Sequence, residues 1–306
     1  MKVLVAGASG AVGLPIVRRL VEQGHQVHGL VRGESGAERV SAQGATALRA
    51  DVLDYEDVSR AVESAQPEVV IDQLTALPRH YSPQTMRDTL APTNRVRVTG
   101  GANVQKAALR CGARRFLAQS GAYFYEPGPG LADESAGFVD GGPPLVAGNV
   151  AAFRAVEDRV ASLPRKVSGL ILRYGFFYGP GTWYSREGDV GEQARAGDLA
   201  VLGNGTGVWS FVHLEDAAEF TARAAVESDA TGAVNVTDDD PLPVGDIFRA
   251  FAAHVGAAAP PSVAITEETD PNAVYYATCM RGASNRRARD EFGFRPRRLE
   301  WLDSSP

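Results

Sequence analysis

Short apolar runs alternate with helical apolar patterns along most of this sequence. Residues 2–7 (KVLVAG) form a continuous apolar run, which is typical of a strand buried on both faces. Apolar residues then recur at helical spacing over 11–24, where Gly24 suits a C-cap. Further strands are expected at 25–33, 45–51, 67–74, 114–120, 167–175, 205–213 and 232–236. Further helices are expected over 100–112, 148–163 and 215–227.

This regular alternation of strand and helix predicts an α/β fold with right-handed βαβ units and a doubly wound, Rossmann-type parallel sheet. Three segments rich in glycine, proline or acidic residues interrupt the pattern, at 126–144, 178–206 and 256–275. We expect them to be loops and lid-like pieces around a site.

The segment GASGAVG (7–13) lies between the first strand and the first helix. Gly7 allows a tight turn, Gly10 lets the backbone approach a pyrophosphate, and Gly13 lets the helix pack closely so that its N-terminal amides face the anion. In this strand–turn–helix context the motif predicts a dinucleotide site rather than a simple turn. The cofactor-binding residues expected here are Gly7, Ser9, Gly10, Ala11, Val12 and Gly13.

The end of the second strand bears on which dinucleotide binds. An NAD site usually has an acid there for the ribose hydroxyls, but this sequence has Arg32 followed by Gly33. Arg32 could face a 2′-phosphate, so NADP(H) is preferred, with NAD(H) as the alternative if Glu34 or a later residue takes the ribose. Asp51 and Val52 are placed to meet the adenine edge. We also expect Leu74, Thr75 and Gln119 to contact the cofactor.

Composition narrows the class of protein. The chain has 306 residues, 44% of them hydrophobic, and no run of eighteen apolar residues or secretory leader, so a cytoplasmic protein without a membrane partner is expected. Its net charge of −6 disfavours nucleic acid as a partner, and its two cysteines form no metal motif. Three consecutive acids at 238–240 cannot all face one ion, so no metal is expected.

Several segments, in order, carry a family resemblance: GASGAVG, RADVLDYEDV, RRFLAQS, LRYGFFYGPGT, WSFVHLEDAA, GAVNVTDDDPLPV and RGASNRRARDEFGFRP. With them the chain resembles the extended short-chain dehydrogenases/reductases, also called the NAD-dependent epimerase/dehydratase family. The resemblance implies a Rossmann domain (1–175 plus 206–237) and a smaller C-terminal α/β substrate-binding domain (176–205 plus 238–306). It also implies that residues 174–177, with Tyr174, Phe176 and Phe177 as cofactor-binding residues, run past the nicotinamide. A homodimer is expected from the resemblance alone.

The departures from the family concern its catalytic groups, a tyrosine and lysine on one helix and a serine or threonine after a strand. Counting back from Glu157, which matches the family's helix glutamate, the tyrosine position holds Asn149 and the lysine position Phe153. The serine/threonine position, four before Tyr125, is Gly121. All three groups are therefore absent from their usual places.

Other residues are candidates to replace them. Tyr123 follows the fifth strand, and Ser120 ends that strand at its carboxyl edge. Asn149 could donate an amide proton to a substrate oxygen or cap the helix that it begins, and the cap is the favoured interpretation. Where relatives that act on nucleotide sugars have an arginine, this chain has Trp209. Aromatic residues are dense near the expected cleft, which favours an apolar or aromatic small molecule, with Tyr123, Tyr178, Tyr184 and Trp209 as substrate-binding residues.

The sequence thus predicts an atypical NADP(H)-dependent oxidoreductase that acts on a small apolar or aromatic carbonyl, enone or alcohol, with secondary metabolism as one setting. Enone or imine reduction would tolerate loss of the tyrosine–lysine pair better than alcohol oxidation. Two alternatives stay open, a non-redox cyclase, isomerase or lyase on the same fold and a non-catalytic sensor of the NADP redox state.

Overall fold

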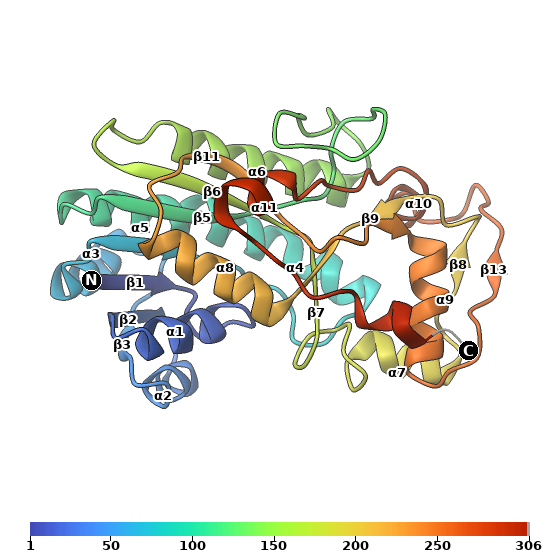
Figure 1. The fold of residues 1–306 in the computed structure, drawn as a ribbon, viewed down its shortest axis with the longest axis horizontal. Helices are drawn as coiled ribbons and strands as arrows, with labels where there is room; N and C mark the ends of the chain where they lie inside the picture. The colour runs from blue at the N-terminus through green and yellow to red at the C-terminus, as the bar shows by residue number, and fades with distance from the viewer. Residues whose placement is uncertain (305–306) are drawn as a thin grey trace.

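A seven-stranded parallel sheet forms the middle layer of the larger part of the computed structural model, which describes residues 1–304 (Figure 1). Its strands are β1 (Lys2–Ala6), β2 (Gln26–Val31), β3 (Thr46–Arg49), β4 (Val69–Asp72), β5 (Arg115–Gly121), β6 (Ser168–Tyr174) and β11 (Gly232–Val236). They lie in the order β11-β6-β5-β4-β1-β2-β3, so the direction of winding reverses between β1 and β4. The predicted doubly wound α/β fold is confirmed.

Helices cover both faces of this sheet. On one face lie α1 (Gly13–Glu22), α2 (Glu34–Ser41), α8 (Leu214–Val226) and α11 (Arg286–Phe292). On the other lie α3 (Tyr55–Ala65), α5 (Gly101–Arg110) and α6 (Pro144–Ala161). A long helical segment leads into α5, formed by α4 (Pro83–Arg95) and a π-helical turn, η1 (Val96–Gly100). The helix α4 packs beside α6.

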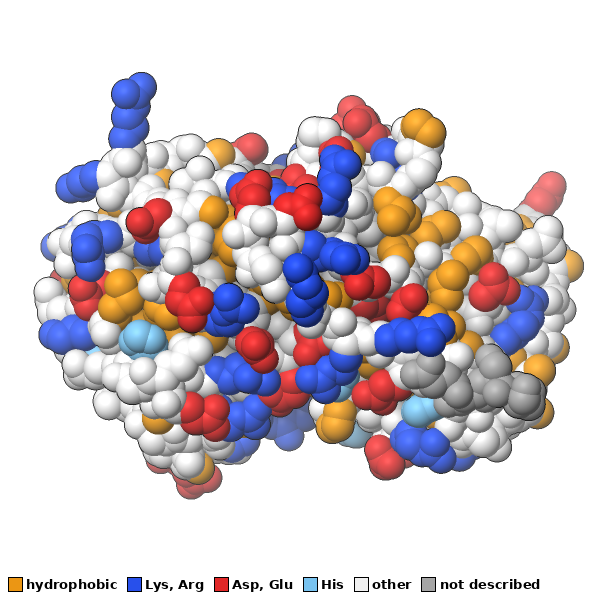
Figure 2. All heavy atoms as spheres, in the orientation of Figure 1, with side chains coloured by type: hydrophobic (Ala, Val, Ile, Leu, Met, Phe, Trp, Pro, Cys, Tyr) orange, Lys and Arg blue, Asp and Glu red, His pale blue; other side chains and the backbone are white. Residues whose placement is uncertain are grey.

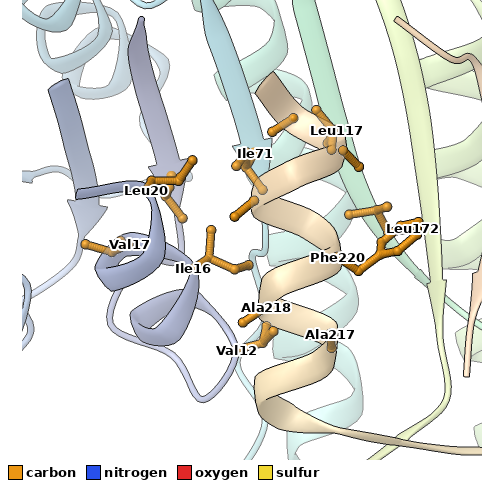
Figure 3. Close-up of a cluster of buried hydrophobic side chains, with 14 of the residues drawn as sticks. Val12, Ile16, Val17, Leu20, Ile71, Leu117, Leu172, Ala217, Ala218 and Phe220 are labelled. Atoms are coloured by element: carbon orange, nitrogen blue, oxygen red, sulfur yellow. The ribbon is translucent and has the colours of Figure 1, made fainter. Parts of the chain in front are cut away.

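The apolar core follows from the sequence pattern. Ile16 and Leu20 of α1 and Phe220 of α8 project onto Ile71 and Leu172 of the sheet (Figure 3). All five side chains are at most 4% exposed. Because strands of a parallel sheet are covered on both faces, their continuous apolar runs have no solvent side to supply polar residues.

A second group of elements gathers beyond the carboxyl ends of the strands (Figure 1). Its helices and short strands are β7 (Phe176–Tyr178), α7 (Asp189–Ala196), β8 (Val201–Leu202), β9 (Val208–Trp209), β10 (Phe211–His213), β12 (Leu242–Pro243), α9 (Val244–His254), β13 (Ser262–Val263), α10 (Pro271–Thr278) and η2 (Glu300–Ser304). They pair as β10-β7, β12-β9 and β13-β8. The division into domains at the boundaries given above stays a prediction.

Three sequence expectations are wrong in detail. The strand expected over 205–213 is interrupted at Ser210, whose hydroxyl accepts a hydrogen bond from the Ala283 amide. The expected loops 178–206 and 256–275 contain α7, β8, β13 and the start of α10. The helix expected from residue 148 begins at Pro144, because a proline at the first helical position needs no hydrogen-bond acceptor for an amide proton.

Acidic and basic side chains alternate over the face shown in Figure 2. The basic residues near the C-terminus are part of this mixture, because Arg287 pairs with Glu291 at 3.0 Å and Arg297 with Asp216 at 2.8 Å. Within residues 1–304, no helix is both long and apolar enough to cross a membrane.

Candidate active site

The loop between β1 and α1 has the geometry that a pyrophosphate requires. Gly7 has a φ of +76°, and a Cβ there would lie 2.6 Å from the carbonyl oxygen of Gln73. A Cβ on Gly13, the first residue of α1, would lie 2.2 Å from the carbonyl oxygen of Gly7. Ser9 is partly exposed, and Gly10 and Ala11 are exposed, at the top of this turn, whereas Val12 is buried beneath it. These residues fit a dinucleotide, because glycines without side chains let the phosphates come close to the backbone at the N-terminus of a helix.

The end of β2 presents positive charge. Arg32 is exposed directly after Val31, and Gly33 caps α2. The first acid of α2, Glu34, pairs with Arg49 at 2.5 Å. Its carboxylate is therefore already engaged by a cation from the end of β3. At this edge Asp51 accepts a hydrogen bond from the Leu53 amide.

The remaining predicted cofactor-binding residues differ in how far their side chains are exposed. Val52, Thr75 and Gln119 are partly exposed near the strand ends, and Leu74 is buried. Tyr174 is fully buried, and its hydroxyl hydrogen-bonds to Thr221 at 2.5 Å and to Gln73 at 3.3 Å. Its phenol is therefore a group of the core. Phe177 packs on the Tyr174 ring, while Phe176 faces the opposite way, into a cavity.

Aromatic rings fill the place where the family's catalytic groups stand. A Cβ on Gly121 would lie 2.5 Å from the ring of Tyr123 and 2.9 Å from the ring of Phe153. The Tyr123 ring also stacks on Phe176, with centroids 4.6 Å apart, and Phe176 stacks on Trp209 at 4.5 Å. Gly121 is thus required by packing, because any larger side chain would displace the ring of Tyr123.

The hydroxyl of Tyr123 does not point at an open site. It donates a hydrogen bond of 3.0 Å to the carbonyl oxygen of Gly175. Burial raises the pKa of the Tyr123 phenol above its usual value, and the nearby Arg97 offsets only part of that increase. A phenol with a bound proton and a raised pKa is a weak acid, so this arrangement gives no support to Tyr123 as the proton donor.

Ser120 is also engaged elsewhere. Its hydroxyl donates to Glu157 at 2.7 Å, and the same carboxylate forms a two-point ion pair with Arg173 at 2.9 and 2.7 Å. All three side chains are largely buried. Ser120 therefore helps to join β5, α6 and β6, and it is not free to polarise a substrate.

Asn149 does not cap a helix, so the interpretation of Asn149 as an N-cap is wrong. It lies in the second turn of α6, where its amide nitrogen donates to the Leu145 carbonyl at 2.9 Å. Its amide oxygen accepts a hydrogen bond of 3.2 Å from Arg97 in η1. Asn149 also lines the cavity that Phe176 faces, so it remains available to a ligand at that wall.

That cavity has a volume of about 280 Å³ and a mainly apolar lining. Tyr184 and Trp209 lie in its wall, where substrate-binding residues were predicted. Further wall residues are Tyr81, Met86, Leu90, Phe176, Trp183, Phe248 and Tyr276. Tyr178, by contrast, is fully buried and donates to the Arg298 carbonyl at 3.3 Å, which makes it a core residue.

Sequence reasoning missed the contribution of α4 to this wall. Its start carries a recognisable signal, because Ser82 and Thr85 form a reciprocal capping box and Pro83 is the first helical residue. Arg97, at the inner end of the same helical segment, was missed as well. Within residues 1–304, no group of three or more histidine, cysteine or acidic side chains could hold a metal ion.

Comparison with known proteins agrees with this geometry. The sequence model of the NAD dependent epimerase/dehydratase family matches residues 3–237. The chain is 41% identical to a 3-diazoavenalumate denitrifying reductase from a Streptomyces species, over 99% of this chain and 98% of that protein. It is 26% identical to a 2-alkyl-3-oxoalkanoate reductase from Stenotrophomonas maltophilia, over 84% of this chain and 76% of that protein.

Among solved structures, UDP-glucose 4-epimerase from Thermotoga maritima has a TM-score of 0.77 at 18% identity and covers 99% of this chain and 96% of its own. The Thermus thermophilus enzyme of that name, in complex with NAD, has a TM-score of 0.73 at 23% identity and covers 98% of this chain and 96% of its own. These likenesses show the fold. The chain belongs to the NAD dependent epimerase/dehydratase family. It is an enzyme of the NAD(P)-dependent oxidoreductase type.

Proposed function

We propose that this enzyme is an NADP(H)-dependent reductase that passes hydride to a small aromatic substrate, with an aryl diazo group as the acceptor. The observation that carries the proposal is the aromatic cluster of Tyr123, Phe153 and Phe176, which fills the places of the family's lysine and its serine or threonine beside an apolar cavity. Asn149, which is no acid, stands at the family's tyrosine position and lines that cavity. It is supported by the relative that is 41% identical, whose name denotes the reductive removal of nitrogen from a diazo compound.

The absence of the family's proton-donating tyrosine suits the reduction of a diazo group. Reduction of a ketone leaves an alkoxide that needs a proton, which the family's tyrosine would donate. An aryldiazonium ion already carries the positive charge, and its nitrogen leaves as a neutral molecule. When bound, the reduced cofactor supplies the hydride, so that ArN₂⁺ and NADPH give ArH, N₂ and NADP⁺, balanced in atoms and charge without a proton from the protein.

The cavity wall suits a planar aromatic substrate. Phe176 and Trp209 present stacked rings, and Tyr276 lies within 6.5 Å of both by ring centroid. Stacking against such rings orients a flat ligand at little cost in conformational entropy.

The preference for NADP(H) rests on charge at the end of β2. Arg32 is exposed there, and Glu34, the acid that would accept from the ribose of NAD, is paired with Arg49. A guanidinium is well suited to a 2′-phosphate, because it offers several donors in one plane.

The proposal is tested with 3-carboxybenzenediazonium ion and NADPH. We expect enzyme-dependent loss of NADPH with equal amounts of benzoate and N₂, measured by absorbance, chromatography and headspace mass spectrometry. The Ala273→Trp variant is the matched control, because Ala273 is exposed at the cavity and a large ring there would narrow it without touching the dinucleotide loop. NADPH loss that is equal in wild type, variant and buffer would refute the proposal.

Enone reduction is the second candidate, favoured by the same apolar wall. Hydride addition to an enone leaves an enolate that water can protonate later, so the missing tyrosine matters less than for a ketone. Running enones, imines, simple aromatic ketones and alcohols beside the diazonium ion separates the acceptors. The proposal expects the diazonium ion to react fastest and the ketones and alcohols not at all.

A further inference from the structure

Arg97 is a buried cation without an acidic partner. It is 8% exposed, it forms no ion pair with a carboxylate among the side chains that the structure describes, and its Nε has no hydrogen-bond partner. The nearby acid, Asp72, is engaged by Arg159 at 3.0 Å and by the Leu74 amide at 3.1 Å. Neutral groups alone hold the Arg97 guanidinium, namely the side-chain oxygens of Asn149 at 3.2 Å and Asn94 at 3.4 Å.

The guanidinium occupies the catalytic locus of the family, although it comes from another element. It contacts Asn149, at the family's tyrosine position, and lies 4.9 Å above the ring of Phe153, at the lysine position. The segment that carries it, η1, is π-helical, and such turns occur frequently at functional sites. A positive charge thus remains at this locus after the lysine is lost.

One wall of the candidate substrate cavity lies next to this charge, because Asn149 contacts both. Asn149 and Thr93 both line the cavity, and the buried hydroxyl of Thr93 has no hydrogen-bond partner. Thr93 is 2% exposed. The mainly apolar cavity therefore has the Asn149 amide and the Thr93 side chain in its wall, and the Arg97 guanidinium lies behind that amide, to which it donates a hydrogen bond.

Burying a cation without a counter-ion costs free energy, and a bound anion removes that cost. We propose that Arg97, with Asn149 and Thr93 beside it, binds an anionic oxygen of the aromatic substrate, a carboxylate or a phenolate. The substrate class is then an aromatic anion whose charged oxygen lies at the cavity wall that Asn149 and Thr93 form. This inference names the substrate class of the site proposed above, but it does not depend on which group accepts the hydride.

The cation that lines the cavity itself is Arg87, and it is the rival anchor. Arg87 lies on α4, its side chain is 44% exposed, and it pairs with Asp270 at 3.4 Å. Its charge is thus screened by solvent and already partnered, so it offers less to an anion than the buried Arg97 does.

Binding to the NADP⁺-loaded enzyme tests the assignment without turnover. The probes for calorimetry are 4-methoxycinnamate, which carries only a carboxylate, 4-nitrophenolate, which carries only a phenolate, and methyl 4-methoxycinnamate, which is neutral. We expect at least one anion to bind about tenfold more tightly than the ester, since a hydrogen bond to a charged group contributes roughly 1.5–3 kcal/mol. The tighter anion identifies the charged oxygen.

Arg97→Gln should abolish this preference, and Arg87→Gln should keep it. Asn149→Asp is the second variant, because it places a carboxylate of the same shape against Arg97. It should raise thermal stability and still lose the anion preference. A purely structural Arg97 would also be stabilised by Asn149→Asp, but the preference would then survive.

Three results would overturn the inference. They are equal affinity of wild type for both anions and the ester, an unchanged preference in folded Arg97→Gln or Asn149→Asp, and loss of the preference in Arg87→Gln instead. Because no hydride moves in these experiments, an anion preference without diazonium turnover would reject the proposed function and leave this inference standing. Diazonium turnover without an anion preference would reject this inference and leave the proposed function standing.

Discussion

The phenol of Tyr123 donates its proton to the carbonyl oxygen of Gly175 at 3.0 Å, inside an aromatic cluster. A tyrosine thus stands close to the family's catalytic site, and we expect that it does not serve as the acid. Because that proton is held and the pKa of the phenol is raised, Tyr123→Phe should keep the single-turnover rate of hydride transfer within about threefold of wild type. It should lower the free energy of unfolding by about 1 kcal/mol, measured by urea denaturation. A loss of a hundredfold or more in rate with intact NADPH binding would show that Tyr123 is the acid, at the ~10²-fold scale of general acid catalysis.

The packing of Gly121 against Tyr123 and Phe153 predicts strong coupling between these positions. A Cβ at Gly121 would lie 2.5 Å from the Tyr123 ring, so Gly121→Ala should destabilise the protein by about 1–3 kcal/mol. In the Tyr123→Ala background the same change should cost much less, because the ring has gone. A double-mutant cycle in urea measures the coupling, and additive effects would contradict the packing argument.

Charge at the end of β2 predicts the choice of cofactor. Arg32→Ala should lower kcat/KM for NADPH by about tenfold and leave that for NADH nearly unchanged, because the 2′-phosphate loses a charge-assisted hydrogen bond. Arg39→Ala is the matched control, since Arg39 is exposed on α2, where it donates to the Ser35 carbonyl. An equal loss for both cofactors in Arg32→Ala would place Arg32 outside the phosphate site.

A buried carboxyl predicts a pH dependence of stability. Asp238 is 1% exposed, one of its oxygens has no hydrogen-bond partner, and burial raises its pKa to about 8. Repulsion from the neighbouring Asp216, Asp239 and Asp240 contributes to this raised pKa, and the hydrogen bond from the Asp240 amide opposes it. In the unfolded chain Asp has a pKa of about 3.9, so the native state alone holds this proton between about pH 4 and 8. Stability from this group is full below that window and is lost as pH rises through it.

Asp238→Asn should remove that loss. Its stability relative to wild type should increase from pH 5 to pH 8, by up to about 1 kcal/mol per pH unit, and level off above pH 8. Thermal unfolding of both proteins across this range gives the difference, in which the other titrating groups cancel. A constant difference would mean that Asp238 is ionised in the folded protein throughout.

The sequence predicted the parts of this structure that are local. The apolar runs within β1 and β4 are continuous because both faces of the sheet are covered, and the glycines of 7–13 act within one turn. The helix α4 escaped prediction because its few apolar residues, such as Met86 and Leu90, face a cavity rather than the core.

Side-chain direction and long-range partners were not predictable. Ser120 lies at the expected edge of the sheet, but only the fold shows that its hydroxyl points to Glu157. Nothing in the sequence distinguishes Arg97 from the other arginines of its polar helical segment. Its role depends on its contact with Asn149, 52 residues away, and on the absence of a nearby free carboxylate among the side chains that the structure describes. Both are properties of packing, and no spacing in the sequence encodes them.

The central claim is that hydride transfer here needs no proton donor from the protein. The single-turnover rate of NADPH oxidation by 3-carboxybenzenediazonium ion, corrected for the rate without enzyme, tests it between about pH 6 and 8, where the probe carboxylate stays ionised. The account predicts a rate that varies by less than about twofold over this range. A rate that falls about tenfold per pH unit above a single pKa would reveal a protein acid and contradict it.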